Sequence, residues 1–364
     1  MPRIPLMYYL LVFAPIAVIA RLASADPVIV FILSALGLVP LAKLIGDATE
    51  ELAIYTGPKL GGLLNATLGN AAELIITIFA IQAGLLELVR ASITGSILGN
   101  LLLVLGFSIA LGGWKHGLQH FDKRTASINA TLLVLAVVAL AIPSLFDRVL
   151  VERPESELLF SEGVALILIV LYGLMILYSF TARHDPHADE TGAVRESAAV
   201  EHHTARWSLR FTIGVLAAAT IGTALVSETL IGAVEPVVES LGLTEFFLGI
   251  IIIPLIGNIA EHLVAVQVAL KNKMELSLAV SLGSSLQIAL FVAPVLVFVS
   301  LLFDNRLLLV FNEFELVALF GTSLIAALIA LDGESNWLEG AMLLAVYLII
   351  ALAFFFLPAH IAAP

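Results

Sequence analysis

Two short segments of the chain repeat one pattern of residues that could bind a cation. Each has a glycine, an asparagine directly after it, and a glutamate three residues beyond the asparagine: Gly69, Asn70 and Glu73, then Gly257, Asn258 and Glu261. Both segments lie inside apolar runs long enough to cross a bilayer. An ionisable residue at the centre of such a run costs about 2.5–3.5 kcal/mol. One glutamate could be tolerated by protonation or a neighbouring hydroxyl, but a matched pair indicates a function.

The residue types favour a hard cation. Glycine is where a helix can unwind and leave carbonyl oxygens free, and asparagine supplies an amide oxygen on the same helix face as the glutamate. With the carboxylates, these oxygens suit Ca²⁺, and the chain has no cysteine for thiolate-bound zinc or copper. We therefore predict one metal site near the membrane midplane, formed by the two glutamates and the two asparagines and lined by Gly69 and Gly257.

A pair of carboxylates also predicts how such a site would work. Two close carboxylates repel, so they titrate as a coupled pair. One Ca²⁺ neutralises both charges, and two protons do so equally well. The empty, doubly ionised site would be costly to desolvate, so we expect conformational switching only when the site is loaded. This pattern predicts obligatory exchange of Ca²⁺ for protons, with no cofactor beside the transported ions.

A second group of polar residues follows in the next apolar run of each half. These residues are Ser96, Gly99 and Asn100, then Ser284 and Gln287. Small residues such as serine and glycine allow helices to pack closely, which is the plain structural interpretation. The amides of Asn100 and Gln287 need hydrogen-bond partners, so we interpret them as partners of the carboxylates or as lining of the ion path.

Four further residues stand outside these two groups. Glu51 and Glu239 precede the central glutamates by the same interval in each half, either as solvated helix ends or as acidic mouths that attract cations at opposite membrane faces. His262 follows Glu261 and could relay protons, although adjacent helical residues point to different faces and packing explains it as well. Lys43 is expected at a helix end, where its side chain can reach the membrane surface.

The composition is that of an integral membrane protein. Of the 364 residues, 60% are hydrophobic and 13% are charged, and the mean hydropathy is +1.08, whereas soluble domains are about 25% charged. The net charge of -12 argues against nucleic acid as a partner. An enzyme is not expected, because no His-Glu-x-x-His, Gly-x-Gly-Asp or Gly-x-Ser-x-Gly motif is present. An intramembrane enzyme is the alternative from a different class.

Hydropathy predicts an all-α protein with about eleven membrane-spanning helices. The expected organisation is a peripheral first helix over residues 1–26, a five-helix unit over 27–181, a polar linker over 182–206 and a second five-helix unit over 207–364. The first segment also resembles a signal peptide, with a cleavage site at 23–25, but we interpret it as a retained helix. The lipid bilayer is the expected partner, and a homo-oligomer is compatible with the sequence.

The two five-helix units are predicted to be internal repeats. The segment 51–98 aligns with 239–286 without a gap. The matches in Gly, Asn, Ser, Thr and Glu are the evidence for a repeat, because polar residues are scarce in this chain and are not expected to match by chance. The alignment pairs each span of the first unit with the span five places later. Because five is an odd number, the paired helices cross the bilayer in opposite directions. Inverted repeats related by an axis in the membrane plane are typical of transporters, and this symmetry would bring Glu73 and Glu261 face to face.

Lysine and arginine gather on one side of the membrane if the N-terminus is cytoplasmic. The N-terminus and the 182–206 linker are therefore expected in the cytoplasm, and the C-terminus on the outer side. The linker holds four histidines: His184, His187, His202 and His203. They indicate either a metal-sensing tract or, more simply, a solvated loop.

Three segments, 65–73, 257–262 and 283–291, closely resemble the motifs of the cation/proton exchanger (CAX) family of the calcium/cation antiporter superfamily. The resemblance covers nearly the whole chain. It implies eleven helices, exchange of Ca²⁺ for H⁺, and Glu73 and Glu261 as the central acids. The sodium/calcium branch usually has Gly-Ser or Gly-Thr with a proline before the acid, whereas this chain has Gly-Asn and no such proline. Protons are the implied counter-ion, and a Na⁺-coupled or monovalent cation exchanger is the alternative.

Overall fold

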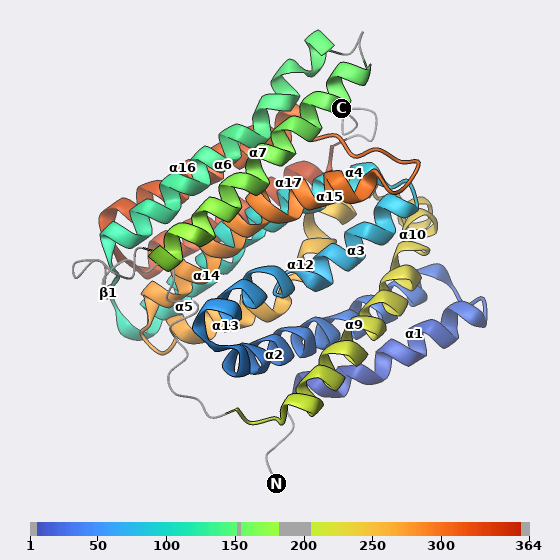
Figure 1. Ribbon diagram of the computed structural model, residues 1–364, viewed down its shortest axis with the longest axis horizontal. Helices are drawn as coiled ribbons and strands as arrows, with labels where there is room; N and C mark the ends of the chain where they lie inside the picture. The colour runs from blue at the N-terminus through green and yellow to red at the C-terminus, as the bar shows by residue number, and fades with distance from the viewer. Residues whose placement is uncertain (1–5, 151–153, 182–204, 358–364) are drawn as a thin grey trace.

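The computed structural model describes residues 6–150, 154–181 and 205–357, which form a bundle of helices lying mostly along the long axis of the molecule (Figure 1). The first half contains, in chain order, η1 (Leu6–Val12), α1 (Phe13–Leu22), α2 (Pro27–Leu68), α3 (Ala71–Gln82), α4 (Leu86–Leu98), the π-helical turn η2 (Gly99–Val104), α5 (Leu105–His116), β1 (Gln119–His120), α6 (Lys123–Leu150) and α7 (Pro154–Thr181).

The second half begins at α9 (Leu209–Ile231). It continues with α10 (Val234–Leu241), α11 (Glu245–Phe247), the π-helical turn η6 (Leu248–Ile252), α12 (Ile253–Gly257), α13 (Ile259–Ala269), α14 (Met274–Gln287), the π-helical turn η7 (Ile288–Val292), α15 (Ala293–Ser300), α16 (Glu313–Asp332), β2 (Glu334–Ser335) and α17 (Trp337–Phe355). The all-α prediction is confirmed, apart from the two-residue strands β1 and β2, which pair antiparallel.

Local sequence explains where the long helices begin. Asp26 accepts hydrogen bonds from the backbone N–H of Val28 and Ile29, and Pro27 opens α2, the residue order preferred at a helix start. At α16, the Asn312 side chain accepts from the N–H of Glu315, whose carboxylate accepts from the N–H of Asn312. This reciprocal capping box fixes the first turn of a helix that begins inside apolar surroundings.

Eight helical segments of the described residues are long and apolar enough to cross a membrane. A ninth candidate is the pair Glu245–Gly257 and Ile259–Ala269, which is bent by 63° at the break between them. Two shorter apolar helices, Met7–Leu22 and Ala71–Gln82, lie where further crossings are expected from hydropathy. Exposed leucine, isoleucine and phenylalanine side chains cover the outside of this bundle, as a lipid-facing surface requires. The predicted number of eleven crossings stays a prediction.

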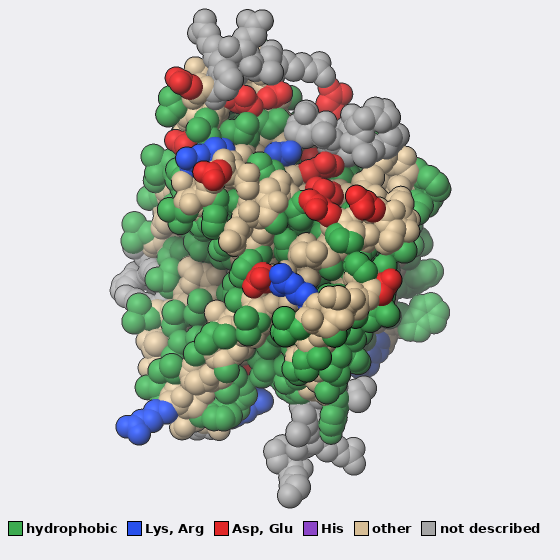
Figure 2. Space-filling model, turned by 90° about the vertical axis from the view of Figure 1, so that its right-hand side faces the viewer, with side chains coloured by type: hydrophobic (Ala, Val, Ile, Leu, Met, Phe, Trp, Pro, Cys, Tyr) green, Lys and Arg blue, Asp and Glu red, His purple; other side chains and the backbone are tan. Residues whose placement is uncertain are grey.

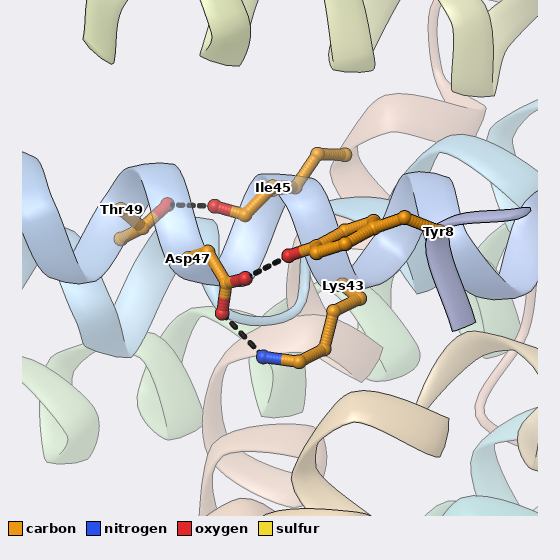
Figure 3. Close-up of polar contacts among 5 residues, drawn as sticks. All are labelled: Tyr8, Lys43, Ile45, Asp47 and Thr49. Atoms are coloured by element: carbon orange, nitrogen blue, oxygen red, sulfur yellow. Dashed lines mark hydrogen bonds and ion pairs between the residues drawn. The ribbon is translucent and has the colours of Figure 1, made fainter. Parts of the chain in front are cut away.

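The first helix lies at the edge of the bundle, where α1 packs against α2 and α9 (Figure 1). Figure 3 shows how the chain before it is attached: the Tyr8 hydroxyl and the Lys43 ammonium both donate hydrogen bonds to the Asp47 carboxylate. Lys43 therefore lies inside α2, so the expectation of a helix end is wrong, whereas a side chain that reaches the membrane surface stays a prediction. The charge of Lys43 is paired with Asp47, one helical turn away.

The two halves show matching features at equivalent positions of the repeat. Each has a broken helix followed by a helix with a π-turn, η2 in the first half and η7 in the second. The half-helices α3 and α13 begin near the centre of the molecule and run to opposite ends (Figure 1). The β1 strand lies at one end, and α10 at the other. The α10 end, seen in Figure 2, carries many acidic side chains and few basic ones.

Candidate cation site

The centre of the bundle is built from two broken helices. The break between α2 and α3 falls at Gly69 and Asn70, and the break between α12 and α13 falls at Asn258. Glu73 and Glu261 are each the third residue of the half-helix that follows. Each break therefore directs a helix N-terminus, with its positive end of the helix dipole, toward a carboxylate. This electrostatic attraction offsets part of the cost of burying the two acids.

The two central glutamates each lie against the other half of the chain. A Cβ atom added at Gly69 would lie 3.5 Å from Glu261 Oε1, and one added at Gly257 would lie 3.5 Å from the Cβ of Glu73. Each acid thus packs against the glycine of the other half. A larger residue at Gly69 would enter the space next to the Glu261 carboxylate, and one at Gly257 would press on the Cβ and backbone of Glu73. The structure brings together four of the residues singled out from the sequence.

The hydroxyl groups of two serines are the first hydrogen-bond partners of the acids. Ser96 in α4 donates to Glu73, and Ser284 in α14 donates to Glu261. The two serines occupy equivalent positions in the repeat, as do the two glutamates. Both serines were expected near the site, although close helix packing explained them equally well. Their hydroxyls are directed at the carboxylates.

The two asparagines link the halves as well. Asn70 donates from Nδ2 to Gln287 Oε1 at 2.7 Å, and Asn258 donates from Nδ2 to Ser96 Oγ at 3.0 Å. Asparagine at a helix start normally caps the helix, but neither of these side chains caps its own half-helix. Both amides instead form hydrogen bonds between the repeats. Each one joins a helix break to the helix whose serine contacts the carboxylate of the other half.

Several oxygen atoms remain available at this centre. Glu73 is only 1% exposed, and its Oε2 has no hydrogen-bond partner among the described residues, nor has Asn70 Oδ1. Glu261 is less deeply buried than Glu73. Carboxylate, amide and hydroxyl oxygens are the ligands that Ca²⁺ prefers. Within the described ranges, no three His, Asp or Glu side chains gather into a metal cluster.

The remaining predicted residues of the second polar group lie around this centre. Asn100 is 1% exposed within the π-turn η2, and its Nδ2 has no partner in the described part of the chain. A Cβ added at the adjacent Gly99 would meet no heavy atom within 4 Å, although Gly99 is buried. An unpaired amide next to unfilled space fits a polar path better than a direct bond to either glutamate. His262 is 7% exposed, and its Nε2 is unpaired within the same described ranges.

The outlying acids have different surroundings. The Glu51 carboxylate accepts hydrogen bonds from the backbone N–H groups of Arg206 (2.9 Å) and Trp207 (3.3 Å), just before α9. Glu239 is exposed at the end of α10. The acidic-mouth interpretation of both stays a prediction. The four linker histidines, His184, His187, His202 and His203, lie outside the described residues.

A third buried acid was missed by the sequence reasoning. Glu315 is 3% exposed and accepts a hydrogen bond at 2.8 Å from Thr94, which lies just before Ser96 in α4. Its other oxygen accepts from the N–H of Asn312 in the capping box of α16. The Asn-x-x-Glu pattern at 312–315 could have indicated this cap. Both oxygens are occupied, so Glu315 serves helix α16 and is not part of the central pair.

The chain matches the family model described as sodium/calcium exchanger protein over residues 27–181 and 211–356. It belongs to this family. A Ca(2+)/H(+) antiporter of Aphanothece halophytica is 46% identical over 363 residues, with 97% of each chain covered. The Ca(2+)/H(+) antiporter ChaA of Bacillus subtilis is 42% identical over 354 residues, covering 96% of this chain and 99% of that one. These relatives are named as antiporters, not as enzymes.

Solved structures agree with this family membership. Native YfkE superposes with a TM-score of 0.82 at 40% identity, covering 97% of this chain and 100% of that one. The H⁺/Ca²⁺ exchanger CAX has a TM-score of 0.74 at 17% identity, covering 98% of this chain and 89% of that one, which shows the shared fold. The expected resemblance to cation/proton exchangers is thereby confirmed, and the chain is a multi-pass integral membrane protein of this family.

Proposed function

We propose that this protein exchanges Ca²⁺ for protons across a membrane, with Glu73 and Glu261 as the shared binding site. One observation carries the proposal: each central glutamate lies against the glycine of the opposite half, and its carboxylate accepts a hydrogen bond from a repeat-related serine. The relatives that cover nearly the whole chain bear the name Ca(2+)/H(+) antiporter, which supports the same choice of ions.

The residues suggest how the exchange is coupled. When Ca²⁺ is the load, the two carboxylates and the Asn70 amide oxygen supply hard oxygen ligands. When protons are the load, the same carboxylates become neutral and the ion leaves. A doubly ionised empty site would place two like charges beside each other in an apolar centre. We propose that the protein switches its access only when loaded, as alternating access by inverted repeats requires.

The decisive experiment measures Ca²⁺ uptake into proteoliposomes driven by a pH gradient, with and without Na⁺. We expect uptake that collapses when a protonophore removes the gradient and that is insensitive to Na⁺. Uptake that needs a Na⁺ gradient and ignores pH would instead support the Na⁺-coupled alternative. No Ca²⁺ movement under either gradient would contradict the proposal.

Neutralising either central acid provides the matching test at the site. Glu73→Gln and Glu261→Gln keep the side-chain shape, but each leaves only one carboxylate to hold a divalent ion. We expect both variants to lower pH-driven Ca²⁺ uptake to the level of empty vesicles while the protein remains folded. Asp304→Asn, an exposed acid outside the centre, is the matched control and should transport normally. Normal exchange by either glutamine variant would remove that acid from the site.

A further inference from the structure

The half-helices that carry the two central acids are short and broken from the segments before them. α3 has 12 residues and α13 has 11. Because each is joined to the preceding segment through a break, its position depends on how its other end is held. The last carbonyl groups of a helix have no partner within that helix. Here the following turns supply one donor each, with the N–H of Gly84 on the Ile81 carbonyl and the N–H of Asn272 on the Ala269 carbonyl, both at 3.0 Å. A side chain from the other half supplies a second donor to each carbonyl. The C-terminal ends of α3 and α13 lie at opposite ends of the molecule (Figure 1).

At the end of α13, the donor comes from the β1 segment. Gln119 donates from Nε2 to the carbonyl oxygen of Ala269 at 3.1 Å and to Asn272 Oδ1 at 2.9 Å. The Gln119 side chain is 1% exposed. Lys115 donates to the next carbonyl, that of Leu270, at 2.9 Å. The loop after α5 therefore holds the end of the half-helix that carries Glu261.

At the end of α3, the donor comes from the loop between α15 and α16. Asn305 donates from Nδ2 to the carbonyl oxygen of Ile81 at 2.9 Å. The same nitrogen lies 3.6 Å from where a Cβ on Gly84 would be. The Asn305 amide thus covers both the carbonyl and the turn that ends the half-helix carrying Glu73.

The two arrangements are equivalent under the internal repeat. The alignment that pairs Glu73 with Glu261 also pairs Ile81 with Ala269. It pairs Gly84 with Asn272 as well, the residues with positive φ (83° and 60°) that end each half-helix. The donors are exchanged between halves: a loop of the second half holds α3, and a loop of the first half holds α13. Chance packing does not explain two primary amides on repeat-related carbonyls at opposite ends of the molecule.

We propose that Gln119 and Asn305 are positioning residues for ion exchange, each fixing the half-helix that carries one central glutamate. This rests on the proposed function. A half-helix released at its C-terminal end can slide or tilt, and that motion moves the carboxylate at its other end relative to the opposite acid. Loss of either amide donor therefore weakens Ca²⁺ binding more than it slows turnover.

The test uses nearly isosteric variants of the full-length protein in proteoliposomes. Gln119→Glu and Asn305→Asp keep shape but cannot donate, and Gln119→Met and Asn305→Leu remove both donor and charge. Each is expected to raise the Ca²⁺ concentration at half-maximal uptake about three- to tenfold, the effect of losing one hydrogen bond, with a smaller change in maximal rate. Equilibrium Ca²⁺ binding to purified protein should weaken by the same factor.

A substitution at a second residue tests the same contact. A Cβ on Gly112 in α5 would lie 2.1 Å from Gln119 Oε1 and 3.3 Å from the Ala269 carbonyl oxygen, so Gly112→Ala crowds both partners of this contact without changing their chemistry. Alanine is favoured over glycine within a helix, so a weakened Ca²⁺ affinity reports the displaced contact. Leu118→Ala, at a half-exposed neighbour in the same loop, and Asp304→Asn are the controls and should keep wild-type affinity.

The outcomes separate this proposal from the function itself. If wild-type protein exchanges Ca²⁺ and the amide variants reach half-maximal uptake at the same Ca²⁺ concentration as wild type, the positioning role is refuted and the function stands. The same conclusion follows if the variants lose rate only in proportion to lost folded protein. If wild-type protein moves no Ca²⁺, the proposed function itself fails, and equilibrium Ca²⁺ binding by the amide variants still decides whether the contacts shape the site.

Discussion

Ser96 and Ser284 place one hydroxyl donor on each central carboxylate. A hydrogen bond to an ionised group contributes about 1.5–3 kcal/mol. Under the function proposed above, the serines therefore bear on the competition between Ca²⁺ and protons for the carboxylates as well as on packing. They do so symmetrically, because each serine lies in the helix that follows its own half-helix.

Removing either hydroxyl should shift this competition toward the proton. For Ser96→Ala and Ser284→Ala we expect about a tenfold rise in the Ca²⁺ concentration at half-maximal uptake near pH 7. The rise should shrink as pH increases, because fewer protons then compete for the carboxylate. Uptake measured at a series of pH values checks this. A pH-independent change, or none, would assign the serines to packing alone.

The sequence singled out residues that the structure brings together at the centre, because scarce polar types recur at a fixed separation in an apolar chain. It could not predict which partners they contact. The bonds from Asn70 to Gln287 and from Asn258 to Ser96 join residues 217 and 162 positions apart. Such pairings depend on how the helices cross, and helix crossing is set by side-chain packing that no local pattern records.

At the scale of elements, the positions of the crossing segments followed from hydropathy, whereas their internal irregularities did not. The π-turns have glycine or proline in or just after them, Gly99 in η2, Gly249 in η6 and Pro294 after η7. Regular helix in this chain also contains such residues, for example Pro143 in α6, so they do not by themselves predict a π-turn. The prediction for Lys43 fails for a related reason. Its partner Asp47 stands one turn away in the sequence, but a charge near an apolar run more often marks the end of a helix.

The start of α6 offers a test with a defined pH dependence. The Thr125 N–H donates to Asp122 Oδ2 at 2.6 Å. Slight burial alone would raise the pKa of Asp122, but hydrogen bonds from Thr125 and the neighbouring Arg124 lower it. A lowered folded-state pKa means that the carboxylate stabilises the fold above its ordinary pKa of about 3.9, and that this contribution is lost as pH falls.

We therefore expect Asp122→Ala to lower the unfolding temperature at pH 7, by the few degrees that the loss of a helix cap of about 1 kcal/mol produces. The difference from wild type should shrink as the pH is lowered toward 3, where the aspartate becomes protonated. Thermal unfolding in detergent at both pH values measures it. Asp122→Asn, which retains a capping oxygen, should stay close to wild type at pH 7.

Glu51 in α2 connects to the segment just before α9 through two backbone N–H groups. Two substitutions separate the two roles of Glu51, which are to hold the segment before α9 and to attract cations. Glu51→Gln keeps an acceptor oxygen but removes the charge, whereas Glu51→Ala removes both. If the acidic mouth operates, Gln raises the Ca²⁺ concentration at half-maximal uptake at low ionic strength, and added salt abolishes the difference. If Glu51 only holds the chain, Gln behaves as wild type and Ala increases proteolysis near residue 206.

At the scale of the whole molecule, the central site exists only where the two halves meet. Every contact that defines it crosses between them or is duplicated in both. We expect two separately expressed halves, divided within the 182–204 segment, to lack Ca²⁺ exchange individually and to regain part of it when co-expressed. Uptake assays on vesicles containing one or both halves measure this. Exchange by a single half would contradict a site shared across the repeats.

The repeat itself was readable from the sequence, since a single alignment matched glycine, asparagine, serine and glutamate at once. The exchange of the Gln119 and Asn305 donors was not, because the same alignment, continued past its end, would pair Gln119 with Leu307. Loops change length more freely than helices do. Two repeat-related contacts can therefore be equivalent in space although their donor residues no longer align in the sequence.

Glu73 is sealed inside the protein, whereas its counterpart Glu261 retains some exposure. One duplicated pattern thus occupies two unequal environments in a single molecule. If the halves trade these environments, the acid that was shielded becomes the one that water reaches, and the opening turns toward the opposite compartment. A water-soluble carbodiimide should then label the two glutamates in alternation, and the ratio of labels would report which compartment the transporter faces.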